Sequence, residues 1–192
     1  MFGKNVGVDE AGRGPLAGPI TLAYVICPRK NISGFFRGIK DSKRLTAKAR
    51  GEWFKKIKNH PEIYYGVTSV GESIIDRLGL SKAINLGIAR LLRRSPLGTS
   101  NNFKILLDGG LKAPEAYPQK TIIKGDEKIP VIAAASVMAK VSRDKKMTRL
   151  SRKFPQYGFE IHKGYGTRLH YQMLKKYGFC EIHRISFLSN FL

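Results

Sequence analysis

A strand–turn–strand pattern near the start of the chain most constrains its fold. Residues 5–9 are β-rich and partly alternating, which is typical of a strand. Residues 10–14 contain two glycines and an alanine, which permit the backbone angles of a tight turn. Residues 20–27 form a second, more apolar run, and Pro15 and Pro19 before it exclude a helix there. The pattern therefore predicts two antiparallel strands joined by a glycine turn.

The remaining apolar and capping patterns alternate between strands and helices. We expect strands at 63–70, 103–108 and 121–124, and helices at 47–57, 72–78, 81–92, 131–150 and, beginning near Thr167, within 164–176. This order predicts an α/β protein with a central mixed sheet flanked by helices and a helical C-terminal region. The length of 192 residues suits a single domain, residues 1–192, in which residues from about 160 to 192 form a small C-terminal part.

The charge of the chain points to its partner. There are 35 lysines and arginines against 14 aspartates and glutamates, a formal net charge of +21. Such a charge suits a polyanion, and the long aliphatic segments look like core rather than membrane anchors, so nucleic acid is favoured over an anionic membrane surface. No apolar run approaches the roughly 18 residues of a membrane span. With only two cysteines and no signal-peptide pattern, we expect a cytoplasmic protein.

Carboxylates stand at the ends of three expected strands. Asp9 and Glu10 follow the first strand, and Asp108 and Asp126 follow two later ones. Sheets of α/β proteins place their sites at such ends, and four carboxylates at one spot would repel one another unless divalent cations lay between them. Oxygen ligands alone suit Mg²⁺ or Mn²⁺. In so basic a chain this predicts two-metal hydrolysis of a phosphodiester. The alternative is that each aspartate only begins a turn.

The glycine turn resembles a nucleotide-binding motif without its context. Residues 12–17 match the glycine pattern of dinucleotide-binding proteins. That motif needs a helix N-terminus facing the pyrophosphate, whereas here a second strand follows. We instead expect Gly12 and Gly14 to expose backbone amides that approach a sugar or phosphate closely, with Arg13 as a charged donor beside them.

Motifs along nearly the whole chain resemble those of the ribonuclease HII family, the type 2 ribonucleases H. They occur in the expected order at residues 8–19, 41–43, 107–109, 124–126, 133–144, 162–167 and 183–187. The resemblance implies a ribonuclease H-like fold and endonucleolytic cleavage at ribonucleotides in DNA duplexes and in RNA–DNA hybrids. It also implies that Asp9, Glu10, Asp108 and Asp126 are the acidic residues of the active site, which hold two Mn²⁺ or Mg²⁺ ions.

The resemblance also implies how ribose is recognised. The backbone of Gly12, Arg13 and Gly14 would contact the 2′-hydroxyl, the group that distinguishes RNA from DNA. Tyr165 would pack on the sugar of the next nucleotide, and Arg184 would support the site or contact the strand. We expect Asp9 to bridge the metals, and cleavage on the 5′ side of the ribonucleotide to leave a 3′-hydroxyl and a 5′-phosphate.

The long helix carries the expected phosphate contacts. Ser136, Lys140, Arg143 and Met147 are spaced to share one face, which would offer a hydroxyl and two cations to backbone phosphates. A solvated polar face is the alternative. Lys43 is a similar candidate, and further attraction would come from Lys145, Lys146, Arg149, Arg152 and Lys153. Asp144, which lies among basic residues, is expected to form an ion pair on the helix surface rather than to bind metal.

Two other classes of protein remain open at this point. A non-catalytic nucleic-acid-binding protein would explain the charge but not the carboxylates at strand ends. Another two-metal nuclease of the same fold would explain both, and a requirement for a ribonucleotide separates it from the type 2 enzymes. We also expect a monomer, with no sliding-clamp partner bound through a C-terminal motif.

Overall fold

The structure, a computed structural model, describes residues 3–28, 32–39, 45–97 and 102–188. Its strands are β1 (Lys4–Ala11), β2 (Ile20–Pro28), β3 (Tyr64–Val70), β4 (Phe103–Asp108) and β5 (Gln119–Ile122). Its α-helices are α1 (Ile32–Phe35), α2 (Ala47–Asn59), α3 (Glu72–Leu78), α4 (Leu80–Arg93), α5 (Gly125–Lys128), α6 (Pro130–Ser151), α7 (Phe159–His162) and α8 (Arg168–Tyr177). The 3-10 helices η2 (Pro155–Tyr157) and η3 (Ile185–Phe187) precede α7 and follow α8.

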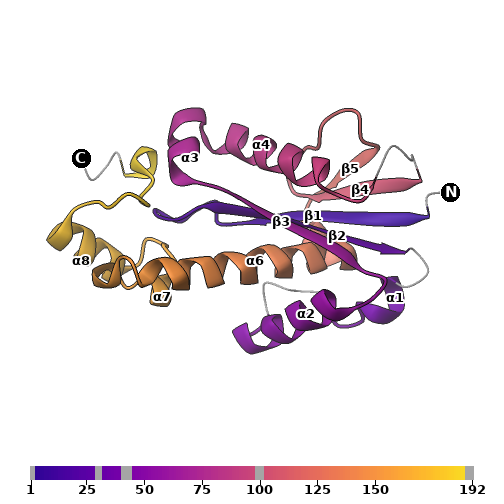
Figure 1. Cartoon of the computed structure of the whole chain (residues 1–192), viewed down its shortest axis with the longest axis horizontal. Coiled ribbons are helices and arrows are strands. Elements are labelled where there is room, and N and C mark those ends of the chain that lie inside the picture. The colour runs from indigo at the N-terminus through magenta and orange to yellow at the C-terminus, as the bar shows by residue number, and fades with distance from the viewer. Residues whose placement is uncertain (1–2, 29–31, 40–44, 98–101, 189–192) are drawn as a thin grey trace.

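The strands form one mixed sheet in the order β3-β2-β1-β4-β5. The expected antiparallel pairing of β1 with β2 is confirmed, and β1 runs parallel to β4 on its other side. Helices α3 and α4 cover one face of the sheet, and α6 covers the other, with α1 and α2 beside it (Figure 1). The predicted α/β class, a mixed sheet flanked by helices, is therefore confirmed.

The last expected strand differs in its position. β5 ends at Ile122, and Lys124 then adopts a left-handed backbone conformation with φ 54° before α5 begins. Asp126 therefore lies in the first turn of a short helix and not at the end of a strand, as expected from the sequence. The physical reason is a capping interaction, because the amides of Gly125 and Asp126 donate to Asp108 Oδ1 at 2.6 and 3.2 Å.

Helix α6 packs against the sheet at backbone distance. Every residue from 131 to 139 is buried, and the alanines among them leave little side chain between helix and sheet. At Gly7 on β1, a Cβ atom would lie 2.1 Å from the carbonyl oxygen of Val131. Glycine is therefore required at this position, and the contact fixes α6 relative to the acidic end of β1.

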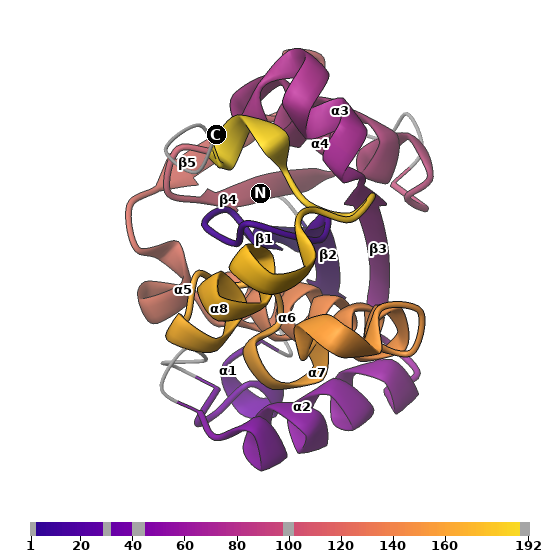
Figure 2. The same cartoon turned by 90° about the vertical axis from the view of Figure 1, so that its left-hand side faces the viewer.

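The C-terminal elements lie at one end of the sheet, beside the segment that connects β1 and β2 (Figure 2). Backbone hydrogen bonds join the two regions: Leu16 N–H donates to Gly164 at 2.8 Å, and Arg184 N–H donates to the Leu16 carbonyl at 2.8 Å. Helix α8 begins next to Thr167, as expected, and the Thr167 hydroxyl caps it by accepting the His170 amide. In the part of the chain described here, no helix is both long enough and apolar enough to cross a membrane.

We expect Gly7→Ala to lower the free energy of unfolding by at least about 1–3 kcal/mol, the usual range for overpacking, because the new methyl group meets helix backbone. Chemical denaturation would measure the change. Gly51→Ala is the matched control: Gly51 lies in α2 with nothing within 4 Å of a Cβ, so the same substitution should stabilise by about 0.5–1 kcal/mol. Equal stability of wild type and Gly7→Ala would contradict the close approach.

Candidate active site

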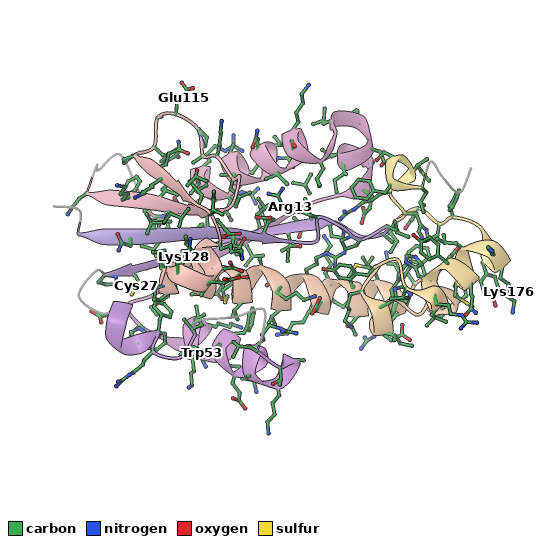
Figure 3. All side chains as sticks on the ribbon, turned by 180° about the vertical axis from the view of Figure 1, so that it is seen from behind. Arg13, Cys27, Trp53, Glu115, Lys128 and Lys176 are labelled. Atoms are coloured by element: carbon green, nitrogen blue, oxygen red, sulfur yellow. The ribbon has the colours of Figure 1, made fainter. Side chains whose placement is uncertain are left out.

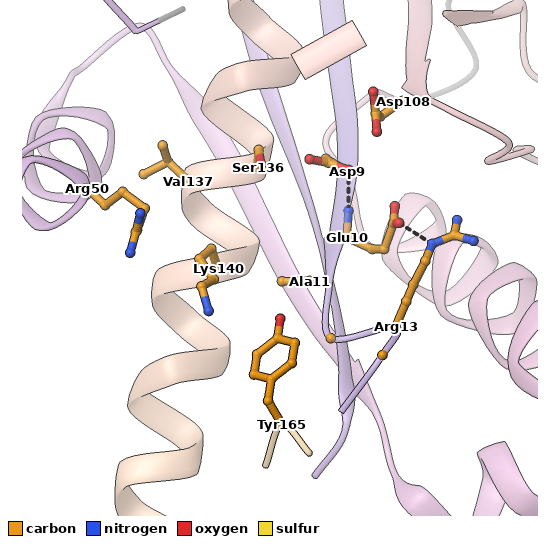
Figure 4. A pocket seen from close by; sticks show the side chains of 12 residues that line it. Asp9, Glu10, Ala11, Arg13, Arg50, Asp108, Ser136, Val137, Lys140 and Tyr165 are labelled. Atoms are coloured by element: carbon orange, nitrogen blue, oxygen red, sulfur yellow. Dashed lines mark hydrogen bonds and ion pairs between the residues drawn. The ribbon is translucent and has the colours of Figure 1, made fainter. Parts of the chain in front are cut away.

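Strand pairing brings the acidic residues to one place. β1 and β4 are parallel with Val8 opposite Leu107, so Asp9 and Asp108, the next residues along, lie side by side. Asp126 joins them because its own amide donates to Asp108. Glu10 follows Asp9, and its amide donates to Asp9 Oδ1 at 2.8 Å. In Figure 4 the Asp9 side chain points toward Ser136 on α6, the Glu10 side chain points toward Arg13, and the Asp108 side chain lies above them in this view.

Asp9 is held in an electrostatically unfavourable environment. It is 2% exposed, and its burial, followed by the charges of Glu10 and Asp108, raises the pKa of its carboxyl well above the usual value. A hydrogen bond with the Ser136 side chain acts in the opposite direction. Among the described residues, the buried Asp9 Oδ2 and Glu10 Oε2 have no hydrogen-bond partner. Buried carboxylate oxygens without a donor are costly, and a cation would relieve that cost.

The acidic residues are neighbours without forming a finished metal site. Within the described residues, no group of three histidines, cysteines or acidic residues already surrounds one point as metal ligands. The donor set, which consists only of oxygens, suits a hard divalent cation.

A cavity of about 370 Å³ combines most of the predicted site residues. It is lined by Asp9, Glu10, Gly12, Arg13, Gly14, Asp108, Ser136, Lys140 and Tyr165, with Ala11, Val137 and Arg50. Sequence reasoning missed Arg50, which reaches the cavity from α2 (Figure 4). A single arginine on an exposed helix carries no sequence signal for such a role. Lys43 lies outside the described residues.

The two remaining predicted contacts, Arg143 and Arg184, are buried in the structure. Both are 0% exposed. Arg143 donates to the carbonyls of Ala17, Pro19 and Lys163 at 2.9–3.1 Å. Arg184 donates to the carbonyls of Gly12, Arg13 and Gly18 at 2.7–2.9 Å.

Every guanidinium nitrogen in these two side chains thus has a backbone partner. A side chain with no exposed surface cannot reach a phosphate, so a direct phosphate contact by Arg143 does not fit this structure. Of the alternatives expected for Arg184, support of the site fits its burial. At Gly12, with φ +103°, a Cβ would lie 2.2 Å from Arg143 Nε, so the turn and the arginine pack without space between them.

Lys140 and Tyr165 remain accessible at the edge of the cavity. Lys140 Nζ donates to Asp144 Oδ1 at 2.9 Å, which is the ion pair expected for Asp144. The same ammonium group lies 5.5 Å from the centre of the Tyr165 ring, which is 41% exposed. The Lys140 charge and the aromatic face of Tyr165 thus lie together beside the acidic residues. Arg13, which is paired with Glu10, lies near the middle of the molecule in Figure 3, far from Lys176 on α8.

A second cavity, of about 640 Å³, lies between α2 and α6. Its basic lining residues are Arg50, Lys145, Arg149 and Lys163, and Arg50 lines the first cavity as well. The acidic residue in its lining, Asp144, is the one paired with Lys140. A basic path therefore leads away from the acidic residues.

Comparisons with known proteins place this geometry in a family. The family model described as Ribonuclease HII matches residues 6–190. A ribonuclease HII of Caldicellulosiruptor bescii is 46% identical over 187 residues, which cover 97% of this chain and 87% of that protein. A ribonuclease HII of Chlamydia abortus is 42% identical over 186 residues, which cover 97% of this chain and 84% of that protein.

Solved structures agree with the sequence comparisons. The crystal structure of ribonuclease H2 from Pyrococcus horikoshii matches with a TM-score of 0.71 at 30% identity, covering 95% of this chain and 93% of that one. The ribonuclease HII of Archaeoglobus fulgidus, solved in complex with PCNA, matches with a TM-score of 0.73 at 26% identity, covering 96% and 94%. A Bst ribonuclease HIII solved with Mn²⁺ shares the fold, with a TM-score of 0.74 at 22% identity, covering 91% of this chain and 63% of that one.

We expect Asp9→Asn to stabilise the metal-free protein at neutral pH by about 1–3 kcal/mol, the usual cost of a buried polar group that lacks its partner. The raised pKa means that the folded protein holds the proton more tightly than the unfolded chain, so ionisation weakens the fold. The gain should vanish below about pH 4, where the carboxyl is protonated in both states, and grow as the pH rises through the folded-state pKa. Denaturation with chelator across this range would measure it.

Glu115→Gln, on the exposed loop between β4 and β5, is the control for this charge removal and should leave stability within about 0.5 kcal/mol of wild type (Figure 3). A neutral-pH stability of Asp9→Asn below that of wild type would mean that the carboxylate is stabilised in the fold, contrary to its environment.

Proposed function

This chain belongs to the ribonuclease HII family and is a ribonuclease H, and we propose that it hydrolyses the phosphodiester on the 5′ side of ribonucleotides. The substrates would be RNA–DNA hybrids and duplex DNA with single embedded ribonucleotides, and the products would carry a 3′-hydroxyl and a 5′-phosphate. The observation that supports this most is the cavity in which carboxylates, a glycine turn, a lysine and an exposed tyrosine meet. Metal binding, close approach to a ribose and contact with a phosphate each need one of these groups.

Asp9, Glu10, Asp108 and Asp126 would hold two divalent cations, Mg²⁺ or Mn²⁺. Their fit rests on the oxygen-only donor set, the unpartnered buried oxygens of Asp9 and Glu10, and the raised pKa of Asp9. When bound, such ions polarise the scissile phosphate and lower the pKa of the attacking water. Asp9, between Glu10 and Asp108, is the carboxylate best placed to be shared by both.

The other residues of the cavity would bind and orient the strand. The carbonyls of Gly12 and Arg13 are fixed by Arg184, which leaves the turn rigid for a close approach of its amides to a 2′-hydroxyl. Tyr165 would pack on the adjacent sugar, and Lys140 would neutralise a neighbouring phosphate. The rigid turn would distinguish ribose from deoxyribose by the position of its amides, since a rigid backbone has no rotamers to order on binding.

The duplex would continue along the second cavity. Arg50, Lys145 and Arg149 offer charges there without base-specific contacts, as expected for a strand recognised through its phosphates. Binding should therefore weaken with salt, and Lys140→Ala should reduce the slope of log affinity against log salt by about one. The expected monomeric state, cytoplasmic location and lack of a clamp partner remain predictions.

A labelled DNA duplex with one ribonucleotide, incubated with Mg²⁺, Mn²⁺ or chelator, tests the proposal. We expect a metal-dependent cut 5′ of the ribonucleotide. Asp126→Asn should lower the rate on the order of 10²-fold or more because a metal ligand is lost. The control Asp144→Asn removes a partly exposed ion pair and should stay within a few-fold of wild type.

Each failure has its own meaning. Full activity in Asp126→Asn together with an inactive Asp144→Asn would reassign the fourth ligand. Binding without cleavage in every metal would indicate a nucleic-acid-binding protein. Cleavage of an all-DNA duplex would indicate a two-metal nuclease of another specificity.

Tyr165→Ala should lower cleavage of the single-ribonucleotide duplex on the order of 10²-fold, since a displacement of about 1 Å at the reacting group costs that much. The metal concentration for half-maximal rate should not change, and the loss on a long RNA–DNA hybrid should be milder, because that substrate offers a 2′-hydroxyl at every position. Tyr64→Ala, which removes another exposed tyrosine but from the edge strand β3, is the control. Small and equal losses on both substrates would make Tyr165 ordinary loop packing.

A further inference from the structure

Three buried histidines lie beneath the loop that carries Tyr165. His162, in α7, is 7% exposed, His170, in α8, is 0% exposed, and His183, after α8, is 2% exposed. The His162 and His170 rings are stacked with centroids 4.4 Å apart, and the His170 and His183 rings lie 5.2 Å apart. The chemistry proposed above uses none of them, yet buried imidazoles need partners for both ring nitrogens.

The partners of His183 fix where its proton lies. The amide of Cys180 donates to His183 Nδ1 at 2.9 Å, and an amide can only donate. The Cys180 carbonyl is farther from the same nitrogen, at 3.3 Å, and the Cys180 thiol, whose Sγ lies 3.2 Å away, can donate to it as the amide does. His183 Nδ1 is therefore an acceptor, and its proton lies on Nε2. That nitrogen faces His170 Nε2 at 3.0 Å.

The partners of His170 fix its proton as well. Its Nε2 must accept the proton offered by His183, so its own proton lies on Nδ1. This Nδ1 is 2.9 Å from the carbonyl oxygen of Tyr165, which can only accept. The chain of bonds thus begins at an obligatory donor, ends at an obligatory acceptor and permits one arrangement of protons.

His162 holds the other side of the loop. The Gly164 amide donates to His162 Nδ1 at 3.1 Å, so the proton of His162 lies on Nε2, which is 2.8 Å from the Tyr157 carbonyl. The N–H of Gly164, the residue before Tyr165, and the carbonyl of Tyr165 itself are thus both hydrogen-bonded to imidazoles. The backbone that carries the Tyr165 side chain is therefore held on both sides.

The loop is also joined to the glycine turn. The Gly164 carbonyl accepts the amides of Leu16 and Ala17 at 2.8 and 3.3 Å, and Ala17 forms a β-bridge with His183. At Gly164, φ is +84° and a Cβ would lie 2.3 Å from the Ala17 carbonyl oxygen, so the two segments pack too closely to accept a larger residue. The histidines therefore set Tyr165 relative to the turn.

Burial opposes protonation of all three imidazoles. Burial is the main cause that lowers the pKa of His170 and of His183 to about 4. Burial also lowers the pKa of His162, which has Glu160 and Lys163 near it. A proton added to His170 would place two N–H groups against each other at the 3.0 Å contact with His183.

We propose that His183 and His170 form a pair of neutral, hydrogen-bonded imidazoles that positions Tyr165 for ribose recognition. We call this pair the imidazole relay, although no proton moves along it. His170 holds the Tyr165 carbonyl, and His183 fixes the tautomer that His170 needs for this. The inference rests on the proposed function in one respect, namely that Tyr165 contacts the substrate strand. His170 and His183 are positioning residues, because each acts on the substrate only through Tyr165.

The first test is independent of activity. Heteronuclear NMR of the imidazole nitrogens of the full chain at neutral pH should show the Nε2–H tautomer for His183 and His162 and the Nδ1–H tautomer for His170. A different tautomer for His170 or His183, or a charged imidazole at either position, would overturn the relay. An inactive wild type would reject the proposed function but leave these tautomers unchanged.

The second test separates positioning from general stability. In His170→Asn the amide can take the place of Nδ1–H and donate to Tyr165, whereas in His170→Gln it takes the place of Nε2 and cannot. We expect His170→Gln to lower cleavage of a single-ribonucleotide duplex by about 10–100-fold, as for other residues that orient a site. His170→Asn should recover much of this loss. His60→Gln, at a histidine beside α2 and Phe35, is the matched control and should match wild type.

The ratio of rates on the two substrates decides the outcome. Loss through Tyr165 should be larger on the single-ribonucleotide duplex than on a long hybrid, with the metal requirement unchanged. Equal losses on both substrates, or equal losses in His170→Gln and His170→Asn, would mean that His170 only stabilises the C-terminal region. If His170→Gln does not fold, the NMR tautomers of wild type and the activity of His170→Asn still decide between the two.

Discussion

Two buried guanidinium groups hold the segment between β1 and β2, and the geometry of the candidate active site depends on them. Arg143 comes from α6 and Arg184 from the C-terminal region, and each donates to three backbone carbonyls. Burying a charge costs several kcal/mol unless hydrogen bonds replace its hydration, and three carbonyl dipoles for each cation provide this. Burial lowers the pKa of Arg184 to about 10, so it remains charged at neutral pH.

This arrangement explains how the chain tolerates its acidic residues. Asp9 and Glu10 are paired with β2 near the end of β1, which leads into the arginine-bound turn, so their backbone cannot relax to separate the charges. Close packing of Gly7 against Val131 also prevents β1 from moving toward α6. The site thus keeps carboxylates in a position that is unfavourable without a cation, a local cost that the tightly packed strand and helix compensate.

The sequence predicts most of the fold and the acidic part of the site. Alternating residues and caps place the strands and helices within a few residues, because these signals are local. Strand ends predict that Asp9 and Asp108 meet, since parallel strands share an edge. Asp126 is correctly grouped with them, but for a different reason, because capping by Asp108 and not a strand end brings it there.

The remaining errors come from contacts between distant segments. Helical spacing predicts that Arg143 and Lys140 share one face of α6. It cannot predict that segments near residues 17 and 163 cover this face at Arg143. Lys140 lies one turn earlier, beyond that cover, and stays accessible. Arg50 was missed for the converse reason, because only the tertiary fold brings α2 beside α6.

The C-terminal region uses its buried polar groups mainly to hold the backbone of neighbouring loops. Its short helices contribute a small apolar cluster, and their polar groups are directed to backbone atoms of two loops. Such bonds give little net stability for each one formed, but a buried group left without its partner is expensive. A region of this kind therefore permits few alternative arrangements. The proposed recognition of a single 2′-hydroxyl would depend on that property, because the groups that detect the hydroxyl must already be in place before the substrate arrives.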